Sequence, residues 1–596
     1  MPLRELRDYN RSKIFEALDR VRGRKALVLE PEFAGPLGLV VEASALREHG
    51  VEIFGALDDA ERLVPQLATQ GVRQVVYVLR GSQASLFGAV RHVSHCRQHC
   101  GVDLEFTWLL VPRPTRLAAR LLDGARLTAD VATHALPLTW ICMDEDVLSL
   151  ELPGALRALA ADGDVGCLWD LAVALDDFQA RYGAVPRIKA KGAASVELVR
   201  LLGRMRHDRG AEAPALGGGP TMMVVLDRSV DMITPSCMQF TYEGLLEELL
   251  GLRCGQLQLP VEAGRKVYGL TAADAVFQET RGRLYQDARR WINDSLRDIQ
   301  RFRDQRLRTA EIPALHGFVA ELRGKLERLR LHTELVEAVA GRLQQPALAA
   351  RAAIEAALLN AEDQAAAIGE LVHCEDDPLA VLRLLCLCSA VHGGLPRRAL
   401  DALRRDFLNA YGHRHLLTLA ALQRAGLIKV REAKRSTYAA VAAALRLMPA
   451  PEPGAEPPPD ISYVYAGYAP LSARLVQAAV GQGGWAAQRA ALEALPGPSL
   501  EVVQGTSAEG RPTHSTDRSA DGVKINHAQA EDASSQPDPA TPRRPVVLVV
   551  FVGGVTSAEV AALRLLSQHN LVPCDFVVAT TAMVTGRSLM LEFAAV

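Results

Sequence analysis

The sequence predicts an α/β fold in which parallel-sheet domains are interrupted by a mostly helical inserted domain. Three observations lead to this prediction. Short runs rich in Val, Leu and Ile are continuously apolar, as expected for strands buried on both faces of a parallel sheet. Helical segments lie between the early runs, which gives the chain a strand–helix–strand rhythm. A long central stretch lacks such runs and is rich in Arg, Ala, Leu and Glu.

The predicted strands fall near both ends of the chain. Each is an apolar run that ends in turn residues, and helices at 37–49 and 85–99 separate the first of them. The first 145 residues are therefore predicted to form one doubly wound α/β domain. The runs lie at 25–29, 75–79, 106–111, 139–143, 222–226, 546–552 and 576–579.

A second α/β domain is predicted in two parts, 146–251 and 460–596, because strand-like runs occur in both. The helical domain inserted between them spans 252–450, with a protrusion at about 272–370 followed by a further helical part. Within 460–596, the polar stretch 501–545 is nearly empty of aromatic residues, which predicts a disordered loop. The protrusion carries one helically spaced apolar stripe, made of Leu322, Leu326, Leu329, Val336, Val339 and Leu343.

The bulk composition excludes several classes of protein. The 596 residues have a formal net charge of -2, so no overall field favours nucleic acid or an anionic membrane. The 10 cysteines form no regular framework and the start lacks an apolar signal region, which favours the reducing cytosol. No apolar run approaches the roughly 20 residues of a membrane span. Membrane contact is therefore expected through a partner or a surface, and no cofactor is expected.

The turn at Gly553-Gly554 follows a strand-like run and opens a helix. Backbone N–H groups at such a turn can hold a phosphate, which leaves a nucleotide-dependent α/β enzyme as an alternative. The third glycine and the lysine of known phosphate loops are missing, however. Thr556 and Glu559 form the pattern of a capping box, which satisfies the same N–H groups internally. The structural cap is the favoured interpretation.

A group of histidines and cysteines shares one face of a predicted helix. Imidazole and thiolate ligands suit zinc, so a zinc-binding scaffold is another alternative. The same spacing describes an ordinary half-buried helix, and no second ligand pair stands out, so the ordinary helix is favoured. The residues are His92, His95, Cys96, His99 and Cys100.

Charged residues follow the strand-like run at 222–226, where α/β enzymes place catalytic groups. With no nucleophile or histidine nearby in sequence, Asp227, Arg228 and Asp231 are better interpreted as a structural turn. We expect Thr234 to cap a helix that has Pro235 at its first position and Gly251 at its end. A further group, Tyr463, Tyr465 and Tyr468, forms either a binding patch or core, and the spacing leaves both open.

The segment 224–251 closely resembles the signature of the Sec/Munc (SM) family of membrane-fusion regulators. The shared features, in order, are an apolar strand, LDR, D-x-x-TP and a TYEGL helix. Other stretches are similar to the family along nearly the whole chain, whereas 262–364 matches loosely. They read ALVLEPEFAGPLGLVVEASALREHGV, LLVPRPT, YGAVPRIKAKG, VLRLLCLCSAVHGGL, YGHRHLLTLAALQRAGLIK, ISYVYAGYAPLSARLVQ and VVLVVFVGGVTSAEVAALRLLS.

This resemblance implies an arch-shaped, three-domain protein that templates SNARE helices by stoichiometric binding, without catalysis. It also implies membership of the HOPS or CORVET tethering complex through a subunit of the vacuolar protein sorting 16 kind. The protein would then lie peripherally on late endosomes, lysosomes or vacuoles. The unbroken AGYAPLS stretch resembles the lysosomal tethering form within the family.

Two sets of residues are expected to bind partners. The positions that match the family's tether-subunit surface are Lys429, Tyr438 and Val441, although Tyr438 and Val441 also fit the core of an apolar helix. Between positions 281 and 330, 13 basic and 7 acidic residues give a local excess of +6. We expect Arg297, Arg301 and Arg308 in this region to face acidic sides of SNARE helices, the alternative being solvated helices.

Overall fold

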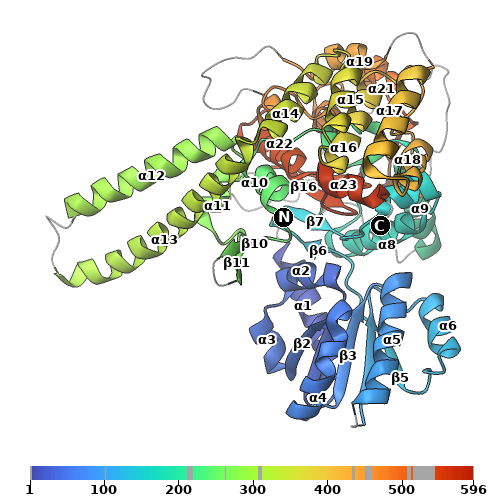
Figure 1. The fold of residues 1–596 in the computed structure, drawn as a ribbon, viewed down its shortest axis with the longest axis vertical. Coiled ribbons are helices and arrows are strands. Elements are labelled where there is room, and N and C mark those ends of the chain that lie inside the picture. Colours follow the sequence, from blue (N-terminus) through green and yellow to red (C-terminus); the bar gives the residue numbers. More distant parts are fainter. Residues whose placement is uncertain are drawn as a thin grey trace. The chain divides into compact units, whose positions relative to one another are not determined.

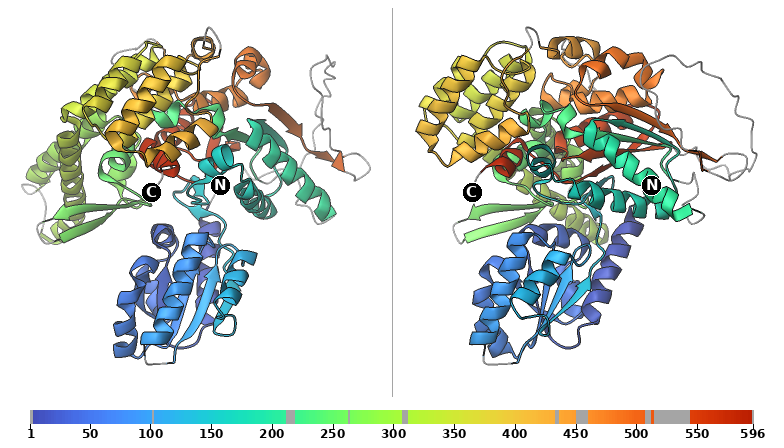
Figure 2. Two further views of the ribbon diagram at one scale, coloured as in Figure 1. Left: turned by 45° about the vertical axis from the view of Figure 1, so that its right-hand side comes forward. Right: turned by 90° about the vertical axis from the view of Figure 1, so that its right-hand side faces the viewer.

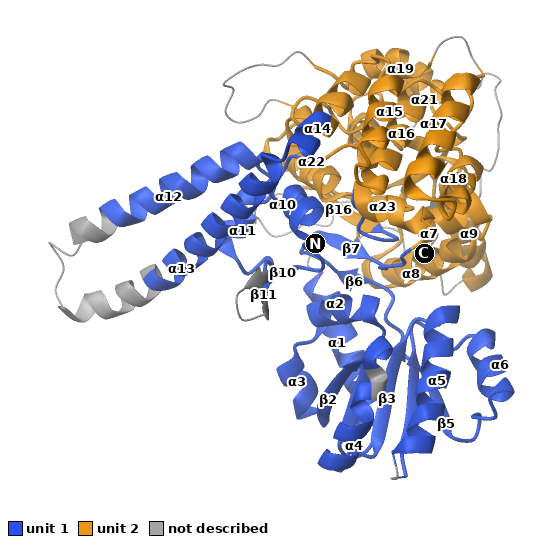
Figure 3. Cartoon of the chain, in the orientation of Figure 1, with its two compact units in different colours: residues 1–153, 239–350, 580–585 blue, residues 154–238, 351–579, 586–596 orange. Residues whose placement is uncertain are grey.

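The structure is a computed structural model that describes residues 3–100, 103–210, 219–261, 264–306, 312–432, 436–449, 460–506, 512–513 and 544–594. The chain forms two compact units (Figure 3). Unit 1 contains Met1–Pro153, Gln239–Ala350 and Thr580–Thr585, and unit 2 contains Gly154–Met238, Arg351–Ala579 and Gly586–Val596. Each unit therefore combines segments that lie far apart in the sequence.

Unit 1 begins with a parallel sheet of strand order β2-β1-β3-β4-β5, with helices on both faces (Figures 1 and 2). Alternate residues of β1 enter different cores, because Ala26 and Val28 pack on one face and Leu27 on the other. This arrangement confirms the predicted α/β fold with a parallel sheet. The elements are α1 (Arg4–Asp19), β1 (Lys25–Leu29), α2 (Pro31–Val40), α3 (Ala43–Glu48), β2 (Val51–Ala56), α4 (Val64–Gln70), β3 (Gln74–Leu79), α5 (Gln83–His99), β4 (Glu105–Leu110), α6 (Arg116–Gly124) and β5 (Val131–Ala135).

Several sequence predictions in this region need correction. Strands β2 and β5 were not predicted, because edge strands contain exposed polar residues and lack a continuous apolar run. The helix predicted at 37–49 is split, since Val41 adopts an extended backbone and is buried between α2 and α3. The strand predicted at 139–143 is reduced to β6 (Ile141–Cys142), which pairs with β7 (Val147–Ser149).

The central part of unit 1 is dominated by two long helices that run side by side, α12 (Tyr285–Arg306) and α13 (Ile312–Leu343) (Figure 1). The predicted apolar stripe is buried at Leu329, Val336 and Val339 and half-buried at Leu326 and Leu343. Leu322 lies outside the described side chains. Shorter elements precede the pair, namely α10 (Tyr242–Leu245), β10 (Gln256–Val261), β11 (Gly264–Gly269) and α11 (Ala275–Thr280).

The sheet of unit 2 runs in the order β12-β8-β9-β15-β16. Its central strands come from distant parts of the chain. Strand β9 pairs in parallel with β15, and the paired residues run from Met222 opposite Val547 to Asp227 opposite Val552. This pairing confirms that a sheet begun before the helical insertion is completed near the C-terminus. The strands are β8 (Arg187–Lys191), β9 (Met222–Asp227), β12 (Ser499–Val503), β15 (Val546–Val552) and β16 (Asp575–Thr580).

Helices surround this sheet and form the rest of unit 2. None of the described helices of the protein is both long enough and apolar enough to cross a bilayer. They are α7 (Ala155–Arg157), α8 (Gly166–Tyr182), α9 (Ala193–Arg209), α14 (Pro346–Leu359, which begins in unit 1), α15 (Ala365–His373), α16 (Pro378–Val391), α17 (Arg397–Tyr411), α18 (His415–Arg424), α19 (Tyr438–Ala444), α20 (Leu471–Val480), α21 (Arg489–Ala494), α22 (Ser557–Gln568) and α23 (Gly586–Phe593).

The helix expected to start at Thr234 starts later. Thr234 lies in a short 3-10 turn, and its hydroxyl donates to Asp231 instead of accepting from the backbone of a following helix turn. Helix α10 is capped by Thr241, whose hydroxyl accepts from the Gly244 N–H at 3.2 Å. Gly251 is confirmed as the stop, with a left-handed φ of 77°.

Candidate functional site

A buried ionic network in unit 2 contains the charged residues that follow β9. The side chain of Arg228 is 1% exposed, and its Nη1 donates to both carboxylate oxygens of Glu559 at 3.0 Å. Its Nη2 lies 3.3 Å from Asp231 Oδ2. Burial lowers the pKa of the guanidinium, but the carboxylates of Glu559 and Asp231 outweigh this and raise it. Arg228 is therefore held as a cation in the core.

The aspartates of this segment are used to fix the backbone. Asp231 accepts the N–H of Thr234 and the N–H of Ser472, each at 2.9 Å. Asp227 accepts the N–H groups of Ser229 and Ala194, each at 3.0 Å. The structural interpretation is thus favoured. Arg228 pairs with Asp231 and Glu559, whereas Asp227 caps the turn that Arg228 begins.

The Gly553-Gly554 turn meets this network at the start of α22. The predicted capping box is present: the Thr556 hydroxyl accepts the Glu559 N–H at 3.2 Å, and Glu559 accepts the Thr556 N–H at 2.9 Å. The Gly554 carbonyl accepts from Arg228 at 3.3 Å. A Cβ at Gly553 would lie 2.8 Å from Arg228 Cβ. The turn is therefore built to pack on Arg228, and the N–H groups of Thr556 and Glu559 at the helix start are used within the chain.

The histidine–cysteine face of α5 is largely core. His92 and Cys96 are buried, with Tyr77 Oη 2.7 Å from His92 Nδ1 and Cys96 Sγ 3.2 Å from His92 Nε2. Burial raises the pKa of the Cys96 thiol to about 12, which opposes the thiolate that zinc requires. His95 and His99 stack on each other instead. Among the described residues, no three His, Cys, Asp or Glu side chains are placed to hold a metal ion.

The tyrosines of 463–468 are mainly core residues of unit 2. Tyr465 and Tyr468 are buried, whereas Tyr463 is half-buried. The Tyr465 hydroxyl lies 3.0 Å from Thr556 Oγ1, and the Tyr468 hydroxyl lies 3.2 Å from Thr234 Oγ1. Both hydroxyls therefore extend the network around Arg228, which decides the open alternative in favour of core for these two.

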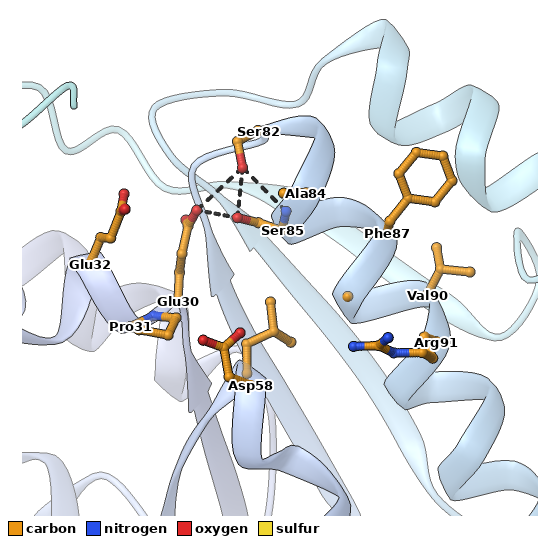
Figure 4. Close-up of a pocket in the computed structure, with 12 residues that line it drawn as sticks. Glu30, Pro31, Glu32, Asp58, Ser82, Ala84, Ser85, Phe87, Val90 and Arg91 are labelled. Carbon is orange, nitrogen blue, oxygen red and sulfur yellow. Dashed lines mark hydrogen bonds between the residues drawn. The ribbon is translucent and has the colours of Figure 1, made fainter. Parts of the chain in front are cut away.

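A pocket of about 660 Å³ lies at the carboxyl edge of the unit 1 sheet (Figure 4). It opens between the end of β1 and the start of α5, where the strand order reverses. Ligands of open α/β sheets bind at such a switch point. The pocket is lined by Glu30, Pro31, Glu32, Leu57, Asp58, Ser82, Ala84, Ser85, Phe87, Gly88, Val90 and Arg91.

The lining of this pocket combines carboxylates with an apolar wall. Glu30 is buried, and its carboxylate accepts the Arg80 N–H at 2.9 Å. It also accepts the hydroxyls of Ser82 and Ser85 (Figure 4). Glu32 and Asp58 are exposed and add negative charge against the single cation Arg91 of the lining. The exposed Phe87 contributes apolar surface. This arrangement suits a cationic side chain with an apolar stem.

The base of the α12–α13 pair is fixed by a buried hydrogen-bonded chain. The Tyr242 hydroxyl lies 2.9 Å from His332 Nδ1, and His332 Nε2 lies 3.2 Å from Asp274 Oδ2. Asp274 also caps α11 through the N–H groups of Val276 and Phe277. The TYEGL segment therefore contributes an anchor for α13, a role that its local sequence does not reveal.

The predicted SNARE-binding arginines lie on the long helix pair. Arg297 and Arg301 are exposed on α12. Each lies close to an aspartate three residues earlier, at 3.2 Å for Asp294 and 3.8 Å for Asp298. Arg308 lies outside the described residues. Arg297 and Arg301 are thus exposed as expected, but each is accompanied by an acidic neighbour.

The predicted tether-binding residues are not all on the surface. Lys429 is exposed, but Tyr438 and Val441 are buried, and the Tyr438 hydroxyl donates to the Leu359 carbonyl at 2.9 Å. The expectation that these two side chains present a surface is corrected, because they pack within the helical part of unit 2. Exposed apolar side chains nearby in sequence are Val430 and Met448. Binding of a tether by this segment stays a prediction.

Similarity to known proteins defines the class. A model of the Sec1 family matches residues 25–592, nearly the whole chain. The chain therefore belongs to the Sec1 family.

Relatives point to one branch of the family. The chain is 31% identical to the vacuolar protein-sorting-associated protein 33 homolog of Arabidopsis thaliana, over 99% of this chain and 97% of that protein. It is 30% identical to vacuolar protein sorting-associated protein 33A of Rattus norvegicus, over 98% of this chain and 96% of that protein. The identity to vacuolar protein sorting-associated protein 33B of Homo sapiens is 25%, over 97% of this chain and 95% of that protein. The resemblance to the SM family is confirmed, and the identity is higher for this A form than for this B form.

Solved structures confirm the fold. The Unc18–syntaxin 1 complex from Monosiga brevicollis aligns with a TM-score of 0.58 at 14% identity, covering 99% of both chains. The SM protein Vps45 in complex with the Qa SNARE Tlg2 aligns with a TM-score of 0.58 at 15% identity, covering 100% of this chain and 98% of that one. At this identity the likeness establishes a shared architecture only.

Proposed function

We propose that this chain binds SNARE proteins and regulates the tethering and fusion of membranes at the late endosome, lysosome or vacuole. The observation that carries the proposal is its 31% identity to a vacuolar protein-sorting-associated protein 33 homolog over 97% of that protein. The solved complexes support SNAREs as the partner class, since Vps45 is bound to Tlg2 and Unc18 to syntaxin 1.

The mechanism is stoichiometric binding. A rigid surface that holds SNARE helices in register meets part of their ordering entropy before the helices bundle. A non-enzymatic role is supported by the charged groups after β9, because Asp227, Arg228 and Asp231 are used in internal hydrogen bonds and ion pairs. No bond is made or broken in this mechanism.

Two surfaces of unit 1 are assigned to SNARE contacts. The first is the exposed side of α12, which carries Arg297 and Arg301. The second is the pocket between β1 and α5, where Glu32 and Asp58 favour a basic side chain of the partner. Together these surfaces offer both signs of charge to a helix.

The tether contact is assigned to unit 2. The chain would join a HOPS or CORVET complex through a vacuolar protein sorting 16-type subunit that contacts the exposed Lys429, while Tyr438 and Val441 are buried. This contact would keep the protein peripheral on the membrane without inserting into it.

The SNARE proposal is tested by binding of the purified full chain to individual SNARE proteins in solution. We expect saturable binding of at least one vacuolar or endosomal SNARE that weakens as salt is raised. Absence of binding to every such SNARE would overturn the proposal.

The tether proposal needs a variant that leaves the core intact. Lys429→Glu changes an exposed side chain, and Lys325→Glu on α13 is the matched control for the charge reversal. We expect only Lys429→Glu to reduce co-purification of the tether subunit. Equal co-purification with both variants would show that the interface lies elsewhere.

A further inference from the structure

The described part of α12 carries a repeated pair of opposite charges. An arginine follows an aspartate by three residues at each repeat, and these arginines are exposed. The Nη1–Oδ1 distances are 3.5 Å for Arg290 and Asp287, 3.2 Å for Arg297 and Asp294, and 3.8 Å for Arg301 and Asp298. We call this set of six side chains the Asp–Arg ladder.

The spacing places the ladder in two parallel rows. Asp294 follows Asp287 by seven residues and Asp298 follows by four more, so at 100° per residue the three carboxylates share one line along the helix. The arginines form a second line beside it. The ladder spans roughly 21 Å of helix at 1.5 Å per residue. It lies away from the buried stripe, which contains Ala288, Ile292 and Ile299.

The side chains of such exposed ion pairs can easily leave each other and pair with charged groups of another protein. An exposed ion pair one turn apart on a helix is weak, because water and salt screen it and two long side chains lose freedom in forming it. The ladder is therefore a poor explanation for the stability of α12. It does present two rows of opposite sign, whose members are seven and then four residues apart, and such rows along one helix face can pair with complementary charges on a neighbouring helix.

We propose that the Asp–Arg ladder selects a partner helix by the pattern of its charged side chains. The partner carries basic side chains opposite the aspartate row and acidic side chains opposite the arginine row, at intervals along its length that match those of the ladder. This inference rests on the proposed SNARE binding and adds a rule of selection to it. It differs from attraction to a uniformly basic surface, in which the aspartates would only weaken binding.

The first variant exchanges the two rows, as D287R/R290D/D294R/R297D/D298R/R301D. This change keeps the net charge and an opposite-charge pair at each repeat, so helix content by circular dichroism and tether co-purification are expected to match wild type. We expect affinity for the SNAREs that bind wild type to fall by roughly tenfold or more, since like charges then face each other. Equal SNARE affinity of this variant and wild type would overturn the proposed selection by the ladder, while SNARE binding itself would stand.

The second variant removes only the acidic row, as D287N/D294N/D298N. A uniformly basic surface predicts tighter binding, because the arginines lose their acidic neighbours. The ladder predicts weaker binding, because the partner's basic residues lose theirs. Tighter binding would therefore overturn the inference even if the six-residue exchange disturbed the helix. Failure of wild type to bind any SNARE would be distinct, since it would overturn the proposed function as well.

Discussion

The guanidinium of Arg228 donates to both carboxylate oxygens of Glu559 at 3.0 Å, although 331 positions separate the two residues. Arg228 follows β9, and Glu559 lies in the first turn of α22. The pair therefore joins the end of one central strand to the helix that follows its neighbour β15. Because both side chains are buried, the pair is a strong constraint on how these segments meet.

Removing the cation of this pair should destabilise unit 2 strongly. In Arg228→Met the carboxylates of Glu559 and Asp231 lose their buried partner, which costs about 3–5 kcal/mol. Urea denaturation followed by tryptophan fluorescence measures the change. Arg297→Met, at an exposed ion pair, is the control and should cost less than about 1 kcal/mol. The double variant Arg228→Met/Glu559→Gln should recover part of the loss, and a double variant worse than the sum would contradict this account.

The hydrogen bond between Tyr242 and His332 should make the effects of substituting these two residues on the free energy of unfolding non-additive. Tyr242→Phe leaves the buried Nδ1 of His332 without its hydroxyl partner, and His332→Gln replaces the imidazole that contacts Tyr242. Each substitution should lower the free energy of unfolding by about 1–3 kcal/mol. The double variant should cost less than the sum, by about 1 kcal/mol, because only one interaction is lost. Hydrogen exchange of α13 amides gives the local readout. Strict additivity would show that the two residues do not depend on each other.

The stability of unit 2 should depend on pH through Glu592. Burial raises the pKa of this carboxyl to about 7, against opposing hydrogen bonds from the backbone at 154–157. Since the folded-state pKa is raised, the stability gained from protonation is complete below about pH 4.5 and is lost as pH rises toward 7. Glu592→Gln should therefore be more stable than wild type by about 3 kcal/mol at pH 8.

This advantage should shrink as the pH is lowered toward 5. Thermal unfolding of both proteins across this range tests it, with the exposed Glu493→Gln as the control. A pH-independent difference between wild type and Glu592→Gln would show that the carboxyl is ionised throughout in the folded protein.

Substitutions at Tyr438 should affect folding before they affect binding. Tyr438→Asp places a charge at a position that is 6% exposed, so loss of a tether subunit with this variant would reflect a damaged core. Tyr438→Phe removes only the bond to the Leu359 carbonyl and should cost about 1–2 kcal/mol. We expect Tyr438→Phe to co-purify the tether as wild type does. Loss of the tether at unchanged melting temperature would restore a direct role for the hydroxyl.

The sequence by itself determined the central strands and the local caps. Strands β1, β3, β9 and β15 are buried on both faces, so each appears as a continuous apolar run in its own few residues. The capping box of α22 is also local, since Thr556 and Glu559 lie three residues apart. The family could be identified for the related reason that its signature is one contiguous segment.

Only the tertiary structure decided what depends on distant partners. The edge strands β2 and β5 are stabilised by pairing with one neighbour and leave polar residues exposed, so their sequences carry no clear strand pattern. The partner of Arg228, the burial of Tyr438 and the Tyr242–His332 bond all join segments at least 79 positions apart. Helical and strand periodicities describe one element at a time, whereas the choice between core and surface is made when elements pack together.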